Sequence, residues 1–400
     1  MNGFGPGKVG WRWGVAFCRV LRRFVVPCLL AGVVLRHATS AAAPPTPVPP
    51  AEAWPVESVL EAARGDLRVA ALPPIAFNLE QETFANEPIA DLGTPGPADS
   101  RADKKPYGSN APLSLGAFWA PATPVVGQPA TLSMNAEFAR IGVPLVMPQE
   151  GEPLWLGIAK FGRLELATDA VLPESGERVP SQLWLVETGV THIRPQDDGG
   201  TLGGTFLFGT ASDRPYAAAR DLTLMAVAFW QTPAANDRDD WSFSVFYSPT
   251  SQLPYPLPGV AYVWKPDDTL EAKIGLPGGI EYRPDEEWEF SLSYFPLVNV
   301  VAVARRHLSE QASLFATYRT DTQIYFLADR LIDDDRLYVF DQRAAVGLER
   351  RLAGGFSVES AVSYLFDRTL FQGTSFTSGR RDVIDFDPGL ALTVQLLWRR

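Results

Sequence analysis

The sequence predicts an all-β protein, an antiparallel up-and-down transmembrane β-barrel of about 12 strands over residues 113–400. Three observations predict it. Four strand–turn–strand units repeat between Val260 and Tyr364, apolar and polar residues alternate along many other segments, and Trp and Tyr gather at segment ends. A single up-and-down sheet of this size tends to close, because closure removes its unpaired edges.

Each repeated unit has a short strand, a basic residue, a tight polar turn and a second strand that alternates apolar and polar residues. The units are Tyr262–Ile274, Ile280–Tyr294, Val303–Tyr318 and Val346–Tyr364. Their turns are centred near Pro266, Pro284, Ser309 and Gly354. This order of residues is typical of antiparallel hairpins.

Other segments carry strand patterns of their own, whereas helical periodicity is nearly absent after residue 113. The further expected strands are Leu113–Trp119, Leu132–Phe138, Trp155–Phe161, Gln182–Ile193, Thr201–Phe208, Leu222–Trp230, Trp241–Tyr247 and Leu390–Trp398. Two breaks, residues 275–279 and 295–297, are each compatible with a tight return or with a kink in one longer strand.

Alternation gives the strands two unlike faces. Phe356, Val358, Val362 and Tyr364 share one face, and Ser357, Glu359, Ala361 and Ser363 share the other. A soluble barrel turns its apolar face inward, and a membrane barrel turns it toward lipid. Alternation alone leaves both orientations open.

Aromatic residues next to turns favour the membrane orientation, because Trp and Tyr prefer the headgroup level of a bilayer. The expected girdle residues are Trp230, Trp241, Tyr247, Trp264, Tyr282, Trp288, Tyr294, Tyr318 and Trp398. The four unit turns are short, whereas we expect longer connections at 231–240, 248–259, 319–336 and 367–388 on the opposite side. Short periplasmic turns and longer outer loops are typical of membrane barrels.

The N-terminus predicts export. Residues 1–43 contain six Lys or Arg and no acidic residue, and Phe24–Leu35 is an apolar run of signal-peptide length. We expect a signal peptide cleaved near Ala41 to Ala43; an uncleaved membrane anchor is the alternative. Residues 44–112 are proline-rich and are expected to form a disordered periplasmic segment, with a plug inside the barrel as the alternative.

Charge and cysteine content exclude several classes of function. Without residues 1–43 the chain has 29 basic and 46 acidic residues, a net charge of about −17, which disfavours nucleic acid as a partner. Cys18 and Cys28 both lie in the expected signal peptide, so no disulfide or thiolate site is expected. No Gly-rich phosphate loop or zinc-ligand spacing is present.

Few residues suggest chemistry, and no catalytic, cofactor-binding or metal-binding residue is assigned. His192 lies at an expected strand end, and His307 in an expected periplasmic turn. Neither stands in a pattern that supplies a nucleophile and an orienting partner, so no enzyme is expected. Two acidic clusters, Asp333–Asp335 and Asp237 with Asp239 and Asp240, are expected to be solvated loops or to meet lipopolysaccharide through divalent ions.

The paired aromatic-x-basic-Pro-Asp turns, Gly275-Leu-Pro277 between them, and Asp334–Tyr338 leading into Arg343–Arg350 carry a resemblance. Over residues 113–400 the chain resembles a family of uncharacterised bacterial outer-membrane barrel proteins, a domain of unknown function. The resemblance implies a fold and a location but no activity. One departure is that Arg399 and Arg400 follow Trp398, whereas many such barrels end in an aromatic residue that the assembly machinery reads.

The expected protein is therefore an outer-membrane barrel that acts as a pore for small polar solutes or as a structural envelope component. Small and acidic inward residues would favour cations. Its expected partners are membrane lipid, lipopolysaccharide and the barrel-assembly machinery. A secreted soluble β-sandwich or barrel that acts as a binding module is the alternative.

Overall fold

The computed structural model describes residues 112–146, 152–236, 238–248, 255–295, 299–330 and 332–398. The expected signal peptide and almost all of the proline-rich segment lie outside these residues. Within these ranges, no helix is long and apolar enough to cross a membrane.

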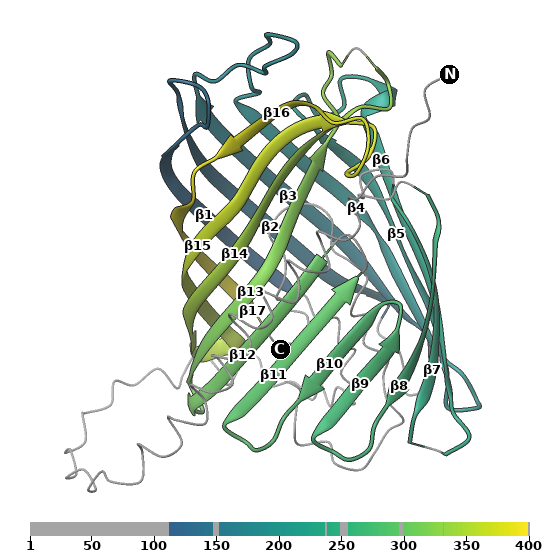
Figure 1. The fold of residues 1–400 in the computed structure, drawn as a ribbon. Coiled ribbons are helices and arrows are strands. Elements are labelled where there is room, and N and C mark those ends of the chain that lie inside the picture. Colours follow the sequence, from purple (N-terminus) through teal and green to yellow (C-terminus); the bar gives the residue numbers. More distant parts are fainter. Residues whose placement is uncertain are drawn as a thin grey trace, which may run out of the picture. The chain divides into compact units, whose positions relative to one another are not determined.

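The described residues form one antiparallel sheet (Figure 1). Its strands are β1 (Leu113–Pro124), β2 (Thr131–Val146), β3 (Leu154–Thr168), β4 (Gln182–Pro195), β5 (Thr201–Ser212), β6 (Leu222–Pro233), β7 (Asp240–Tyr247), β8 (Leu257–Trp264), β9 (Leu270–Gly275), β10 (Gly278–Tyr282), β11 (Trp288–Phe295), β12 (Asn299–Ser309), β13 (Ala312–Tyr325), β14 (Arg336–Arg351), β15 (Phe356–Gly373), β16 (Arg381–Phe386) and β17 (Gly389–Trp398). Two short 3₁₀ turns, η4 (Ala219–Asp221) and η5 (Ala353–Gly355), lie in connections.

The sheet closes into a barrel of 16 strand positions. Each strand from β1 to β15 pairs with the next, and β17 pairs with β1 from Leu113↔Trp398 to Trp119↔Leu392. The 17 strands fill 16 positions because β16 and β17 pair with successive parts of β15. The prediction of about 12 strands was too low, since sequence places strand boundaries poorly. The break at residues 275–279 is a return between β9 and β10, and that at 295–297 lies between the antiparallel strands β11 and β12.

Connections of two kinds lie at the two ends of the barrel. The end named here the turn end carries the connections 196–200, 265–269, 283–287 and 352–355, together with Leu113 and Trp398. The opposite loop end carries 169–181, 213–221, 326–335 and 374–380. The four unit turns therefore share one end, as predicted. The expected long outer connection at 231–240 is wrong, because residues 234–239 join β6 to β7 at the turn end.

The outer face of the barrel carries an apolar band between two rows of aromatic residues. On β15, Phe356 and Tyr364 mark the two rows, and Val362 between them is 54% exposed. The turn-end row comprises Trp155, Trp230, Trp241, Trp264, Tyr282, Trp288, Phe356 and Trp398. The loop-end row comprises Trp119, Phe161, Trp184, Tyr318, Tyr364 and Phe366. Tyr318 belongs to a row but lies mid-strand in β13, not beside a turn as expected.

Toward the loop end the outer face becomes polar on β2 and β3, whereas on β13 to β15 it carries an apolar cluster of Ile324, Tyr338, Phe340 and Phe371 packed against Phe376. On β2 and β3 the outward residues there include Asn135, Glu137, Arg163 and Glu165, and the Arg163 guanidinium lies 3.8 Å from Glu137. The rows are about 26 Å apart along β15, or about 20 Å along the axis at a strand tilt of about 40°. An apolar band of that height between aromatic girdles fits a bilayer. The apolar face of Phe356–Tyr364 therefore points outward, and Ser357 and Ser363 are buried inside.

Inside the barrel, three phenylalanine rings lie flat over glycines of the neighbouring strand. The pairs are Gly116 with Phe138, Gly203 with Phe229 and Gly347 with Phe315, each directly opposite in the strand register. A Cβ atom at any of the three glycines would lie 2.0–2.3 Å from the ring. These glycines allow large side chains to lie along the inner wall.

Candidate functional site

The most unusual part of the barrel is its loop end, where opposite walls meet. β5 and β13 stand eight positions apart in a ring of 16, yet Ser212 and Phe326 form a parallel bridge. The Phe326 backbone N–H donates to the Ala211 carbonyl at 2.8 Å. The connection from β13 to β14 thus reaches across to the end of β5 (Figure 1).

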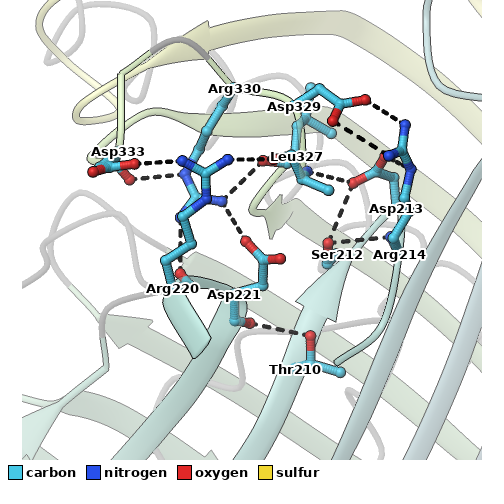
Figure 2. Close-up of polar contacts among 11 residues, drawn as sticks. Thr210, Ser212, Asp213, Arg214, Arg220, Asp221, Leu327, Asp329, Arg330 and Asp333 are labelled. Atoms are coloured by element: carbon cyan, nitrogen blue, oxygen red, sulfur yellow. Dashed lines mark hydrogen bonds and ion pairs between the residues drawn. The ribbon is translucent and has the colours of Figure 1, made fainter. Parts of the chain in front are cut away.

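A buried ion pair between Asp221 and Arg330 stabilises this contact (Figure 2). We call this ion pair the latch. Arg330 Nη1 lies 2.5 Å from Asp221 Oδ1, and the two side chains are 2% and 0% exposed. Arg330 Nη2 also donates to the Arg220 carbonyl at 2.8 Å. Asp221 itself is fixed because its carbonyl accepts from the Thr210 hydroxyl of β5 at 3.1 Å.

Two further contacts flank the latch. The Ala328 backbone N–H donates to Asp213 Oδ1 at 2.7 Å. Arg214 pairs with Asp329, but both of these side chains are mostly exposed (Figure 2). Exposed pairs contribute little to stability, whereas loss of one partner of a buried pair such as the latch is strongly destabilising.

β5 meets β13 at the loop end, and only nine of the 16 strand positions continue to that end. They are the positions of β1 to β5, those of β13 to β15, and the one that β16 and β17 share. The strands β6 to β12 stop lower, since β6 begins opposite Thr210 and β12 pairs with β13 only as far as Arg319. A barrel of about eight strands is just narrow enough for side chains to fill it. The loop end is filled in this way.

The filling is a single apolar cluster, named here the loop-end core. It joins side chains of β1 to β5 to those of β13 to β17 across the axis, and includes Leu132, Leu164, Leu183, Tyr325, Leu337, Leu365 and Leu370. Each of these seven side chains is at most 1% exposed. The loop end is therefore filled with apolar side chains, like the inside of a soluble barrel, and these close its axis.

The wall formed by β7 to β11 is short, and we call it the low wall. Its strands have 8, 8, 6, 5 and 8 residues, whereas a strand needs about 9–11 residues to cross a bilayer. The five residues of β10 rise about 13 Å along the axis. These strands start at the turn-end row, at Tyr282 and Trp288, so they end below the top of the apolar band.

Charged side chains face the lumen beneath the loop-end core. The inner charge cluster consists of Arg319 and Asp321 on β13, Asp341 and Arg343 on β14, and Arg368 on β15. Arg343 Nη2 lies 2.7 Å from Asp321 and 3.0 Å from Asp341. Its guanidinium also lies over the Phe118 ring of β1 at 4.5 Å. The inner wall thus carries arginines that the expectation of small and acidic lumen residues missed.

The residues that the sequence singled out do not assemble into one site. His192 faces outward, and its ring is tilted against that of Trp155 with the two centroids 4.1 Å apart. The predicted position of His307 in a turn is wrong. The residue lies in β12, and its Nδ1 is 2.9 Å from the Ser313 hydroxyl. Asp335 is buried and binds Arg381, so it is not a solvated loop residue.

The second acidic cluster lies at the turn end. Asp240 pairs with Lys265 at 2.7 Å, and Asp239 accepts from the Tyr262 hydroxyl at 2.6 Å and from the Lys265 N–H at 2.7 Å. Together with the Asn236 amide these donors, Tyr262 first, lower the pKa of Asp239 below its usual 3.8. Asp237 lies outside the described residues. Within the ranges that the structure covers, no three His, Cys, Asp or Glu side chains are grouped to hold a metal ion.

The closed wall, the apolar outer band and the two aromatic rows define a transmembrane β-barrel. No family model matches the chain, and no curated protein matches it in sequence. Among solved structures it is similar to an outer membrane channel of Pseudomonas putida F1, at 9% identity and TM-score 0.33, over 75% of this chain and 98% of that one.

Two further similar structures are also barrels. The translocator domain of the autotransporter NalP of Neisseria meningitidis has 11% identity and TM-score 0.29, over 73% of this chain and 89% of that one. A mutant of the Rh. blastica porin has 10% identity and TM-score 0.24, over 71% and 98%. At such distances these are likenesses of barrel form, and the reasoning below uses the geometry of this chain alone.

Proposed function

We propose that the protein is an outer-membrane channel whose route does not follow the barrel axis. It joins the turn end, facing the periplasm, to the side of the barrel above the low wall. Short turns at one end support this orientation, because membrane barrels keep their short turns on the periplasmic side. The proposal retains the resemblance to the uncharacterised outer-membrane family and assigns no catalytic step.

One observation carries the proposal: the loop-end core closes the axis while, among the residues that the structure describes, no strand lies above the low wall in the upper part of the apolar band. Molecules that follow the axis from the turn end meet Leu164, Leu183 and Leu337, all fully buried in contact with their neighbours. The side above β9 and β10 has no such barrier among the described strands. The favoured cargo is therefore a small molecule that tolerates the membrane, rather than the small polar solute expected from sequence.

The inner surface beside the low wall supports this choice. Phe246 of β7 and Phe295 of β11 both point inward, and the centroids of their rings lie 6.1 Å apart. Val227 completes this cluster, with Met225 and Leu257 packed against it. An apolar lining next to a low wall suits apolar or amphipathic molecules, because it offers no hydrogen bonds to replace those of a sugar or an ion.

Transport by reconstituted protein tests the proposal. The full chain in liposomes is expected to admit the apolar dye N-phenyl-1-naphthylamine to an internal binding protein faster than protein-free liposomes do. The same liposomes should stay closed to sugars in a swelling assay. Sugar-driven swelling comparable to that of an open porin would show that the axis conducts, and the side route would then be wrong.

A further inference from the structure

We propose that Arg319 and Arg343 form a binding site for the anionic head group of an amphipathic molecule, on the inner wall beside the low wall. The site deepens the proposed channel function by naming a class of cargo. Binding itself does not depend on transport, so the two proposals can fail separately.

The first support is an unmatched charge. The inner charge cluster has three guanidinium groups, of Arg319, Arg343 and Arg368, and two carboxylates, of Asp321 and Asp341, which leaves one positive charge. Both carboxylates are engaged by Arg343. A charge left uncompensated away from bulk water is costly, and ionisable residues at membrane depth mark functional sites.

The second support is hydrogen-bonding capacity that these two arginines leave unused. Arg319 and Arg343 stand directly opposite each other on β13 and β14, and both face the lumen. Among the described residues, Arg319 forms no ion pair or hydrogen bond, and Arg343 Nη1 is buried without a partner. Like charges directly opposite in a sheet are destabilising, so an anion between them would relieve the repulsion. Two guanidinium groups also match the fork geometry of a carboxylate or phosphate.

The third support is position. Arg319 pairs with Val301, the last rung of the ladder between β12 and β13, and the Val300 N–H donates to the Thr320 hydroxyl at 3.0 Å. Beyond this point β13 continues without β12 beside it. Arg319 therefore stands at the corner of the low wall, where a molecule from the membrane would first meet the inner wall.

The fourth support is the apolar surrounding. Phe118 lies against the Arg343 guanidinium, and Tyr325, on the same face of β13 as Arg319, belongs to the loop-end core. A ligand whose charged head meets the two arginines would therefore have apolar surface close to its body. An inorganic ion would contact the two arginines but would have no apolar body to place on this surface.

A binding experiment in nanodiscs of zwitterionic lipid tests the site with two probes that share one apolar body, 4-phenylbutyrate and neutral 4-phenylbutan-1-ol. We expect the full chain to bind the carboxylate at least about tenfold more tightly than the alcohol. Arg319→Gln should remove that preference, and Arg319→Lys should restore part of it, because lysine keeps the charge but not the fork. Arg283→Gln, at a turn-end arginine paired with Glu281, serves as the matched control and should bind as the natural chain does.

Heat-modifiable migration on gels shows which variants are folded. Equal binding of carboxylate and alcohol by folded natural protein, or an unchanged preference in Arg319→Gln, would overturn the site. Nanodiscs that contain phosphatidylglycerol distinguish the two sources of such a head group. If this lipid displaces 4-phenylbutyrate only when Arg319 is present, the site holds membrane lipid; without displacement, it holds a free amphipathic anion.

Discussion

Asp221 and Arg330 lie 109 residues apart in the chain and form a buried ion pair of 2.5 Å that joins two opposite walls of one barrel. This pair, with the backbone bond from Phe326 to Ala211, reduces a ring of 16 strand positions to nine. The latch thus lies where the two walls that enclose the loop-end core meet.

Breaking the latch should loosen the loop end. Arg330→Met leaves Asp221 buried without its cation, and removing one partner of a buried pair costs about 3–5 kcal/mol. We expect faster cleavage by added protease within residues 326–335 and a measurable ion conductance in planar bilayers. Arg214→Gln, which breaks the exposed pair with Asp329, is the control and should change stability by less than about 1 kcal/mol. If both variants resist protease like the natural chain, the latch does not hold the loop end.

A methyl group at a ring-covered glycine should destabilise the wall. Gly347→Ala would place a Cβ 2.3 Å from the Phe315 ring, and such overpacking costs about 1–3 kcal/mol. Guanidinium unfolding of the refolded protein measures the loss. Gly142→Ala is the matched control, because its nearest contact would lie at 3.9 Å. Equal midpoints for the two variants would show that the ring yields without cost.

The two outer zones should respond differently to a new charge. Ala159 lies on the outer face of β3 between Trp155 and Phe161, whereas Asn135 on β2 lies opposite Trp119 of the loop-end row, at the edge of the apolar band. Ala159→Arg is expected to cost about 2–4 kcal/mol of folding free energy in lipid, and Asn135→Arg close to nothing. Urea titration in liposomes compares them. A reversed order would mean that the apolar band lies elsewhere on the wall.

Acid should weaken the turn end through Asp239. Its pKa is lowered in the folded protein, chiefly by the Tyr262 hydroxyl, so the ionised carboxylate stabilises the fold at every pH above its unfolded value near 3.8. That contribution is lost as pH falls from this value through the folded pKa. The difference in stability between the natural chain and Asp239→Asn should therefore be constant from pH 8 to 5 and shrink below pH 4. Hydrogen exchange at residues 234–239 measures it, and a difference that changes between pH 7 and 6 would point to another group.

Local patterns in the sequence predicted much of the fold. The alternation of Phe356 to Tyr364 predicted two faces, and the structure turns the apolar one outward. The unit turns near Pro266 and Pro284 lie at one end, because their residues form hairpins without help from distant parts of the chain.

Strand number and the candidate site were not predictable in the same way. β9 and β10 are so short that their return at Leu276 and Pro277 resembles a kink in one strand. The latch depends on a contact between residues 109 positions apart, and no local pattern marks it. The opposition of Arg319 and Arg343 exists only in the register of β13 with β14. Because Arg319 lies in the expected connection at 319–336, the sequence could not pair the two arginines.

The polar outer surface of the loop end affects how the protein reaches its place. Glu137, Arg163 and Glu165 stand on the far side of the apolar band from both ends of the barrel-forming chain, Leu113 and Trp398. With the turn end facing the periplasm, as proposed, these charges would have to cross the hydrocarbon, where a single arginine costs about 2–4 kcal/mol at the midplane. The same cost would oppose a return. We therefore expect the charged rim to retain the barrel in the membrane once it has been inserted.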